Sequence, residues 1–152
     1  MIQRIQSVYF LLAGILPAFS FCVPMAHYTG ANGEVLYSMN VWSMSMINGD
    51  ILAHPWGIFS FAIISMVMSI VCIFAYKNRI RQIHLSNILL TAILLFALTF
   101  VAYGYFYGSE YGVRFLPSWG FAFPVLAYLF ATLGRRAVCK DEELVRAADR
   151  IR

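Results

Sequence analysis

Long apolar runs separated by short polar segments dominate the chain. Between Asp50 and Lys77, and again between Arg81 and Glu110, the sequence contains no Asp, Glu, Lys or Arg. A hydrocarbon core of ~30 Å needs only ~20 apolar helical residues, so each of these stretches is long enough to cross a bilayer. The pattern predicts an all-α membrane protein with four transmembrane helices in an antiparallel bundle. The expected helices cover residues of about 8–25, 56–76, 85–107 and 116–133.

Small side chains recur four residues apart within two of these runs. Ser65 and Ser69 share a face of the second predicted helix, and Ala127 and Ala131 share a face of the fourth. Small residues at this spacing let two helix backbones approach closely. We therefore interpret both pairs as helix contacts, and the two serines as packing residues rather than nucleophiles.

Residues 26–55 form the one long connection, and their pattern differs from that of the helices. Apolar residues from Val35 to Val41 alternate with their neighbours at a period of two, which is typical of a strand. Asn32-Gly33 and Asn48-Gly49 are dipeptides that suit tight turns. A short β-hairpin in an external loop is the prediction, and an irregular loop lying on the headgroups is the alternative.

The end of the chain predicts a separate, short amphipathic helix over residues of about 141–151. Asp141 is a favourable N-cap, and acidic residues follow it in the first turn, where the helix dipole favours them. Leu144, Val145, Ala148 and Ile151 give this segment a narrow apolar stripe. We expect the helix to lie at the inner membrane face or to dock on a partner.

Composition strengthens the membrane assignment. The 152 residues fit a single domain, 1–152, and are 61% hydrophobic but only 12% charged. Soluble domains carry about 25% charged residues, and this chain has too few to cover a water-exposed surface. Membrane lipids are therefore the first expected partner.

The distribution of cations predicts the orientation. Of the 11 Lys and Arg residues, Arg114 alone falls on the side of the 26–55 loop, while the other ten fall on the side of both termini. Cytoplasmic loops are enriched in Lys and Arg, so both termini and the segment 77–84 are expected in the cytoplasm. The net charge of +4 follows from this asymmetry, and nucleic-acid binding is not needed to explain it.

This topology brings polar residues of three segments to the inner face. The N-terminus, the 77–84 hinge and the C-terminal tail contribute a candidate docking cluster of Gln3, Arg4, Arg79, Arg81, Gln82, Asp141, Glu142 and Asp149. Headgroup contact and tethering of the tail within the molecule are the structural interpretation. A docking surface for a partner protein is the functional one.

The sequence contains few candidates for chemistry. None of the predicted spans carries an Asp, Glu, Lys or Arg that could relay protons at depth, and no phosphate-binding loop or hydrolase motif is present. We therefore expect no enzyme activity, no cofactor and no catalytic residue. His27 and His54 fall at the outer ends of the first two helices and are weak candidates for a shared metal or haem site.

Three segments of the chain resemble a known family. These are the opening residues 1–6, the hinge residues 78–82, and the ending, 140–146 with 149–152. They are similar to a bacterial family of small inner-membrane proteins with four transmembrane helices, known as domain of unknown function 4293. The resemblance implies a bacterial inner membrane and the four-helix topology, and it implies no activity or cofactor.

Three functional hypotheses follow. The first is a non-enzymatic accessory or scaffold protein that works through protein or lipid contacts, within a larger membrane complex or a homo-oligomer. The second is a small-solute transporter or channel, in which Pro17 and Pro124 would mark broken helices. The third is an outer-face haem- or metal-binding protein that uses His27 and His54.

Overall fold

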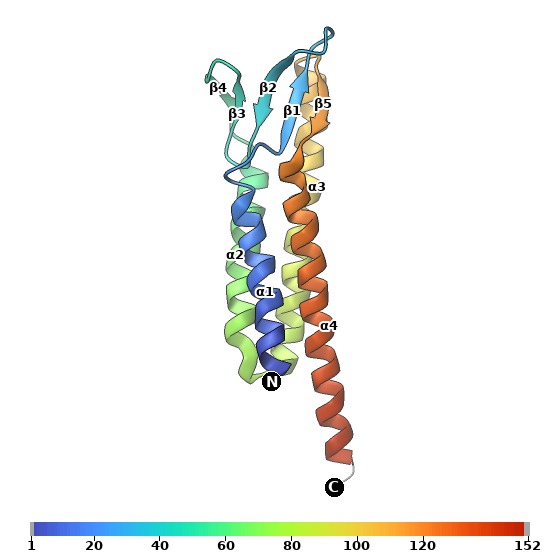
Figure 1. The fold of residues 1–152 in the computed structure, drawn as a ribbon. Coiled ribbons are helices and arrows are strands. Elements are labelled where there is room, and N and C mark those ends of the chain that lie inside the picture. The colour runs from blue at the N-terminus through green and yellow to red at the C-terminus, as the bar shows by residue number, and fades with distance from the viewer. Residues whose placement is uncertain (1, 151–152) are drawn as a thin grey trace.

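The computed structural model describes the backbone of residues 2–150 and the side chains of residues 5–147. Four helices lie side by side, and a five-stranded antiparallel sheet caps one end of the bundle (Figure 1). The helices are α1 (Ile2–Phe19), α2 (Trp56–Phe74), α3 (Arg79–Glu110) and α4 (Ala122–Arg150). The strands are β1 (Ala26–Thr29), β2 (Val35–Met39), β3 (Met44–Met46), β4 (Ile51–Ala53) and β5 (Arg114–Pro117). Two 3-10 turns, η1 (Ala75–Lys77) and η2 (Trp119–Phe121), precede α3 and α4.

The helices pack as a closed ring in which α1 contacts α2 and α4, and α3 contacts the same two. The predicted small-residue faces lie in these contacts, since Ser65, Ser69, Ala127 and Ala131 are all buried. A Cβ placed on Gly14 of α1 would lie only 2.5 Å from the hydroxyl oxygen of Ser69. The prediction that these residues serve helix packing is confirmed.

Polar side chains inside the bundle bond to the main chain of neighbouring helices. Ser69 donates a hydrogen bond to the carbonyl of Phe10, and Gln6 donates to the carbonyl of Ala137 at 3.2 Å. Gln82 donates to the carbonyl of Cys72 at 3.0 Å. A polar group left without a partner in an apolar medium costs several kcal/mol, so these bonds fix how the helices pair.

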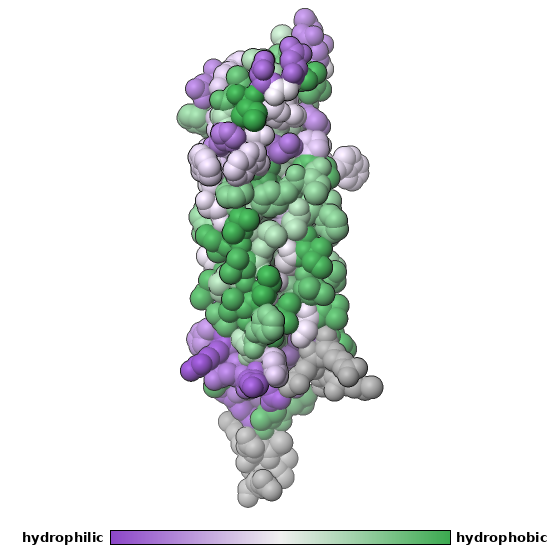
Figure 2. Space-filling view, turned by 90° about the vertical axis from the view of Figure 1, so that its left-hand side faces the viewer, coloured by the Kyte–Doolittle hydropathy of each residue, from purple (hydrophilic) through white to green (hydrophobic). Residues whose placement is uncertain are grey.

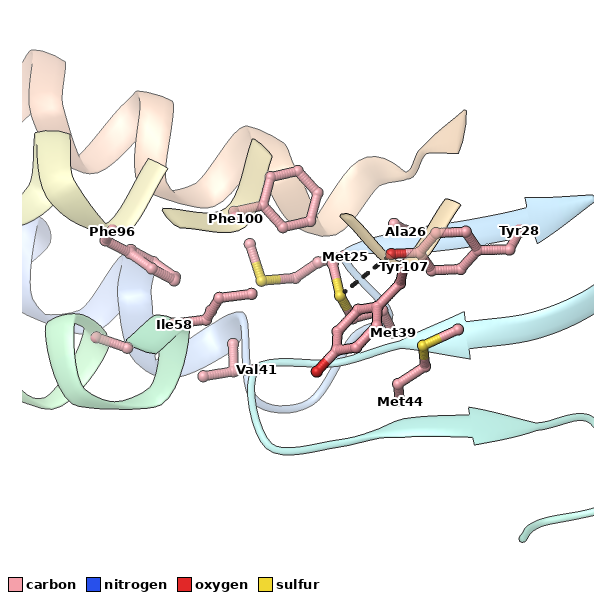
Figure 3. Packing of buried hydrophobic residues seen from close by; sticks show 11 residues of the cluster. Met25, Ala26, Tyr28, Met39, Val41, Met44, Ile58, Phe96, Phe100 and Tyr107 are labelled. Atoms are coloured by element: carbon pink, nitrogen blue, oxygen red, sulfur yellow. Dashed lines mark hydrogen bonds between the residues drawn. The ribbon is translucent and has the colours of Figure 1, made fainter. Parts of the chain in front are cut away.

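Two apolar clusters fill the interior. The lower cluster lies within the helices and comprises Phe10, Ala13, Cys72, Leu89, Ile93, Ala127, Ala131 and Val138. The upper cluster joins the sheet to the helices and includes Met25, Tyr28, Met39, Met44, Ile58, Phe96, Phe100 and Tyr107 (Figure 3). Side chains from β1, β2 and β3 meet side chains from α2 and α3 there, so the sheet is packed onto the bundle.

Tyr28 is the largest fully buried residue of the upper cluster. Its hydroxyl donates to the sulfur of Met39 at 3.5 Å, shown as the dashed line in Figure 3. Burial raises the pKa of Tyr28, and the neighbouring Tyr107 raises it further. This shift in pKa favours the protonated phenol, which is the form that donates the hydrogen bond to Met39.

The predicted hairpin is confirmed and belongs to a larger sheet with the strand order β4-β3-β2-β1-β5. Gly33 and Gly49, the glycines of the two Asn-Gly dipeptides, adopt φ of 79° and 93° at the turns. These positive values are the conformations that glycine reaches without steric cost. Strand β5 was not predicted from the sequence, because it follows α3 and pairs with β1 through a contact distant along the chain.

Helix boundaries differ from the predictions at both ends of α1 and at the start of α3. α1 begins at Ile2 and ends at Phe19, because a turn over residues 20–22 leads the chain into β1. α3 begins at Arg79 rather than near residue 85, so most of the basic hinge is helical. A helix can continue beyond the apolar layer through charged residues. Because hydropathy identifies only the apolar part of a helix, the sequence placed the start of α3 too late.

The separate C-terminal helix predicted over 141–151 is wrong, since α4 runs without interruption from Ala122 to Arg150. Gly134 does not end α4: it lies against the ring of Phe10, whose nearest carbon would be 3.0 Å from an added Cβ. The residues at 116 and 117, predicted to open the fourth helix, instead belong to β5. Asp141 therefore occupies a helix interior and is no N-cap.

Among the residues whose side chains are described, three helical segments are long and apolar enough to cross a membrane: Trp56–Lys77, Arg79–Glu110 and Trp119–Ala147. They indicate a multi-pass membrane protein. The described apolar part of α1, Ile5–Phe19, is shorter than a full span. Figure 2 shows an apolar band across the middle of one face of the molecule, with hydrophilic residues gathered above and below it.

Gly120 provides a test of how the sheet is joined to α4. A Cβ on this residue would lie 2.6 Å from the carbonyl oxygen of Pro24 and 2.9 Å from Cα of Met25, and neither backbone atom can move aside cheaply. We expect Gly120→Ala to destabilise the protein by about 1–3 kcal/mol, measured by thermal unfolding in detergent.

Gly30→Ala is the matched control, because the added Cβ would meet only side-chain atoms: the tip of Leu36 at 3.0 Å, its Cγ at 3.6 Å and Cγ of Glu34 at 3.8 Å. Equal melting temperatures for the two variants would contradict the tight junction at Gly120.

Candidate functional site

The hinge between α2 and α3 positions the cations that the sequence predicted for the inner face. α2 tightens into η1, and Asn78 then adopts an extended conformation, with φ of −126° and ψ of 97°. Its side-chain oxygen accepts a hydrogen bond from the backbone N–H of Arg81 at 3.1 Å, which makes Asn78 the N-cap of α3. This cap fixes where Lys77, Arg79 and Arg81 leave the backbone.

Arg79 and Asp141 form an ion pair between α3 and α4. Nε of Arg79 lies 3.0 Å from a carboxylate oxygen of Asp141, and the two side chains are 28% and 13% exposed. Within α4, Arg146 pairs with Glu142 at 2.9 Å, one turn away. The first pair ties the continuation of α4 to the hinge, and it joins two of the residues predicted to cluster.

The other predicted members of the docking cluster occupy different environments. Arg81 and Glu142 reach the surface, whereas Gln82 is 2% exposed and lies inside the bundle rather than on a docking surface. The side chains of Gln3, Arg4 and Asp149 lie outside the described residues. The structure therefore joins Arg79 to Asp141 and places Glu142 near Arg79, whereas Arg81 lines a different part of the surface at this end.

A polar hollow of about 380 Å³ lies beside the ion pair. Its lining includes Lys77, Asn78 and Arg79 from the hinge and Glu142 from α4. Because side chains of both charges line the hollow, it can form hydrogen bonds and ion pairs with a protein surface that also carries both charges.

The predicted outer-face histidines lie at different positions along the strand order of the sheet. His27 is in β1 and pairs in register with Ser38 of β2 and Leu116 of β5. Its Nδ1 is buried and has no hydrogen-bond partner in the described structure. The residue lines a hollow of about 520 Å³ whose other walls include Leu116, Trp119 and Phe121.

His54 follows β4 and belongs to an aromatic cluster. A ring nitrogen, Nδ1, is hydrogen bonded to the carbonyl of Trp42 at 2.9 Å. The ring centroid of His54 lies 5.4 Å from that of Trp42 and 5.9 Å from that of Trp56. Phe59 completes the cluster, 5.0 Å from Trp42.

The sheet separates the two histidines. β2 and β3 lie between β1 and β4, so the backbones of His27 and His54 are about three strand spacings apart, roughly 14 Å. Among the residues whose side chains are described, no group of three or more His, Cys, Asp or Glu could hold a metal ion. A shared metal or haem site at His27 and His54 stays a prediction.

The aromatic cluster of Trp42, His54, Trp56 and Phe59 was not predicted as a unit. Trp42 and Trp56 are 47% and 59% exposed at the junction of the sheet and the bundle. Tryptophan is typical of the membrane–water boundary, and that preference was the available signal in the sequence. Their contact depends on β4 returning the chain to the start of α2.

The fold and its surface define a class: a multi-pass helical membrane protein whose helix bundle carries a β-sheet at one end. The chain belongs to the family described as domain of unknown function (DUF4293), whose model matches residues 2–151. The resemblance to this family seen in the sequence is thereby confirmed. No curated protein matches the chain significantly.

The Arg79–Asp141 ion pair is expected to slow local unfolding of the part of α4 that extends beyond the bundle. We expect Arg79→Gln or Asp141→Asn to raise amide hydrogen exchange around residues 141–147, by up to about fivefold, because a partly exposed ion pair contributes at most about 1 kcal/mol. The double variant should exchange no faster than either single variant.

Arg81→Gln is the matched control, since it removes a hinge cation outside this pair. Unchanged exchange in the Arg79 and Asp141 variants would show that the ion pair does not hold α4.

Proposed function

We propose that the protein is a non-enzymatic accessory or scaffold protein of a bacterial inner membrane that acts through protein and lipid contacts. The observation that carries the proposal is the extension of α4. This helix continues well past the ends of the other three (Figure 1), and it carries exposed apolar side chains where no other helix covers them. Such a projecting helix is suited to binding a partner.

The chemistry of the extension supports a protein partner. Leu144 and Val145 are 53% and 37% exposed, on a segment whose other described residues are mostly charged. The pairs Arg79–Asp141 and Glu142–Arg146 order this segment near the bundle. An ordered helix with a narrow apolar stripe binds by laying that stripe into a groove or against another helix, in a larger membrane complex or in a second copy of the chain.

The proposal includes four membrane crossings with both termini in the cytoplasm. α1 has 18 residues, which at 1.5 Å per residue span roughly 27 Å, close to the thickness of a hydrocarbon core. It packs against α2 and α4, so it would share their membrane layer. The lopsided distribution of Lys and Arg supports the orientation, with the sheet outside.

Fewer observations support the alternative that the protein is a transporter or channel. Pro124 lies in the first turn of α4, where its missing N–H removes no helical hydrogen bond, so it marks no broken helix. Pro17 lies within the last turn of α1. Apolar side chains fill the bundle interior along both clusters. These observations favour the scaffold.

The native cysteines test the orientation without any substitution. Cys22 is exposed near the sheet, Cys139 is partly exposed near the hinge end, and Cys72 is buried. We expect a membrane-impermeant maleimide to label Cys22 in intact inner-membrane preparations with the periplasmic face accessible, to label Cys139 only after permeabilisation, and to spare Cys72. Labelling of Cys139 before Cys22 would reverse the proposed orientation.

The α4 extension tests the scaffold function. We expect Leu144→Gln combined with Val145→Gln to abolish most crosslinks between residues 140–147 and a partner in native membranes, because the apolar stripe is lost. Crosslinked species would be quantified by mass spectrometry after gentle detergent extraction.

The matched control is Glu143→Gln with Ala147→Gln, which changes two exposed residues on the adjacent face of the same segment. A strictly monomeric wild-type protein, or equal loss of crosslinks in both double variants, would contradict the proposal.

A further inference from the structure

A second hollow, of about 430 Å³, opens on the hinge and differs in character from the one beside the ion pair. Its walls come from the last turns of α2 and from the start of α3. The lining residues are Val71, Phe74, Ala75, Lys77, Asn78, Arg81 and Leu85. It therefore joins an apolar groove on the side of the bundle to two cations and an amide at its end.

The cations of the hinge differ in their partners, and Lys77 lines both hollows. Arg79 pairs with Asp141 and lines the other hollow, in which Glu142 would repel an anion. Among the described side chains, neither Lys77 nor Arg81 forms an ion pair, and both are exposed. No acidic residue lines the second hollow, so its charged end is uniformly positive.

The positions of these groups are set by the backbone. The oxygen of Asn78 accepts the N–H of Arg81, which closes the turn between the two cations. Lys77 and Arg81 lie on either side of this cap, at the end of η1 and in the first turn of α3. The turn thus holds two positive side chains at one rim of the groove.

The apolar wall continues from this rim into the hydrophobic band of the molecule. Phe74 is 74% exposed, and Val71, one turn before it, is 39% exposed. Both belong to the candidate span Trp56–Lys77. An exposed phenylalanine beside two cations at the end of a membrane helix matches a ligand with a long apolar chain and an anionic head.

We propose that this groove is a binding site for one anionic phospholipid. The phosphodiester would lie between Lys77 and Arg81, and an acyl chain would lie along Phe74, Val71 and Leu85. Basic pockets between helices at the cytoplasmic face recognise anionic headgroups in this way. The inference rests on the proposed orientation only in assigning the lipid to the inner leaflet, because binding itself does not depend on which face the hinge occupies.

Native mass spectrometry of the full chain in detergent tests the site, with dioleoylphosphatidylglycerol and dioleoylphosphatidylcholine as probes. We expect the wild type to retain one phosphatidylglycerol in preference to phosphatidylcholine. Lys77→Gln with Arg81→Gln should weaken that retention on the order of tenfold or more, since each cation near an anionic headgroup contributes about fivefold. Phe74→Ser should also weaken it, by removing apolar contact.

The matched control is Arg136→Gln with Lys140→Gln, which removes two exposed cations from α4 at the same end of the molecule and leaves the groove intact. Retention in this variant should equal that of the wild type, and melting temperatures would verify that all variants are folded. Equal losses in both double variants would overturn the site in favour of general charge attraction.

Glycerol 3-phosphate distinguishes a lipid from a soluble phosphate, because it carries the anionic group without the acyl chain. We expect it not to displace phosphatidylglycerol at equal concentration. Displacement, together with unchanged binding in Phe74→Ser, would overturn the lipid assignment. Cysteine labelling reports the orientation independently, so failure of the lipid site and failure of the proposed topology give different results.

Discussion

The structure depends on close helix contacts in which buried polar groups must bond to neighbouring backbone. Ser69 bonds to the carbonyl of Phe10 where Gly14 lets α1 approach α2, and Gln6 and Gln82 bond to carbonyls of neighbouring segments. In an apolar medium the hydrophobic effect gives helices little reason to associate, so packing and hydrogen bonds set the arrangement. These few contacts determine which helix faces meet and hence which residues remain on the surface.

The ends of the bundle follow from that arrangement. At one end, β1 to β4 come from a single connection, and β5 returns from α3 to pair with β1, so the sheet is anchored through both. Tyr28 and Phe100 extend one apolar core from the sheet into the helices (Figure 3). At the other end, α4 extends beyond the other helices. Of the hinge cations there, Arg79 forms an ion pair, whereas Lys77 and Arg81 line an open groove. The proposed partner contact and the proposed lipid site both lie at this end.

The candidate site was only partly predictable from the sequence. Charge counting brought Arg79, Arg81, Asp141 and Glu142 to one end, because topology alone places them there. It could not show that Gln82 points into the bundle, since a polar residue at a helix end is compatible with either environment. The N-cap pattern at Asp141 predicted that a separate helix begins there. Gly134, which precedes that segment, packs against Phe10 within the continuous α4.

The sequence by itself determined the membrane class, the approximate position of the helices, the hairpin turns at Gly33 and Gly49, and the family. Hydropathy, glycine conformation and local motifs are properties of residues that are close together in the chain, so they can be recognised before the chain folds. The tertiary structure decided the pairing of β5 with β1, the continuity of α4, the separation of His27 from His54 and the partner of Arg79. Each of these depends on residues far apart in the chain, whose contact exists only after the helices have packed.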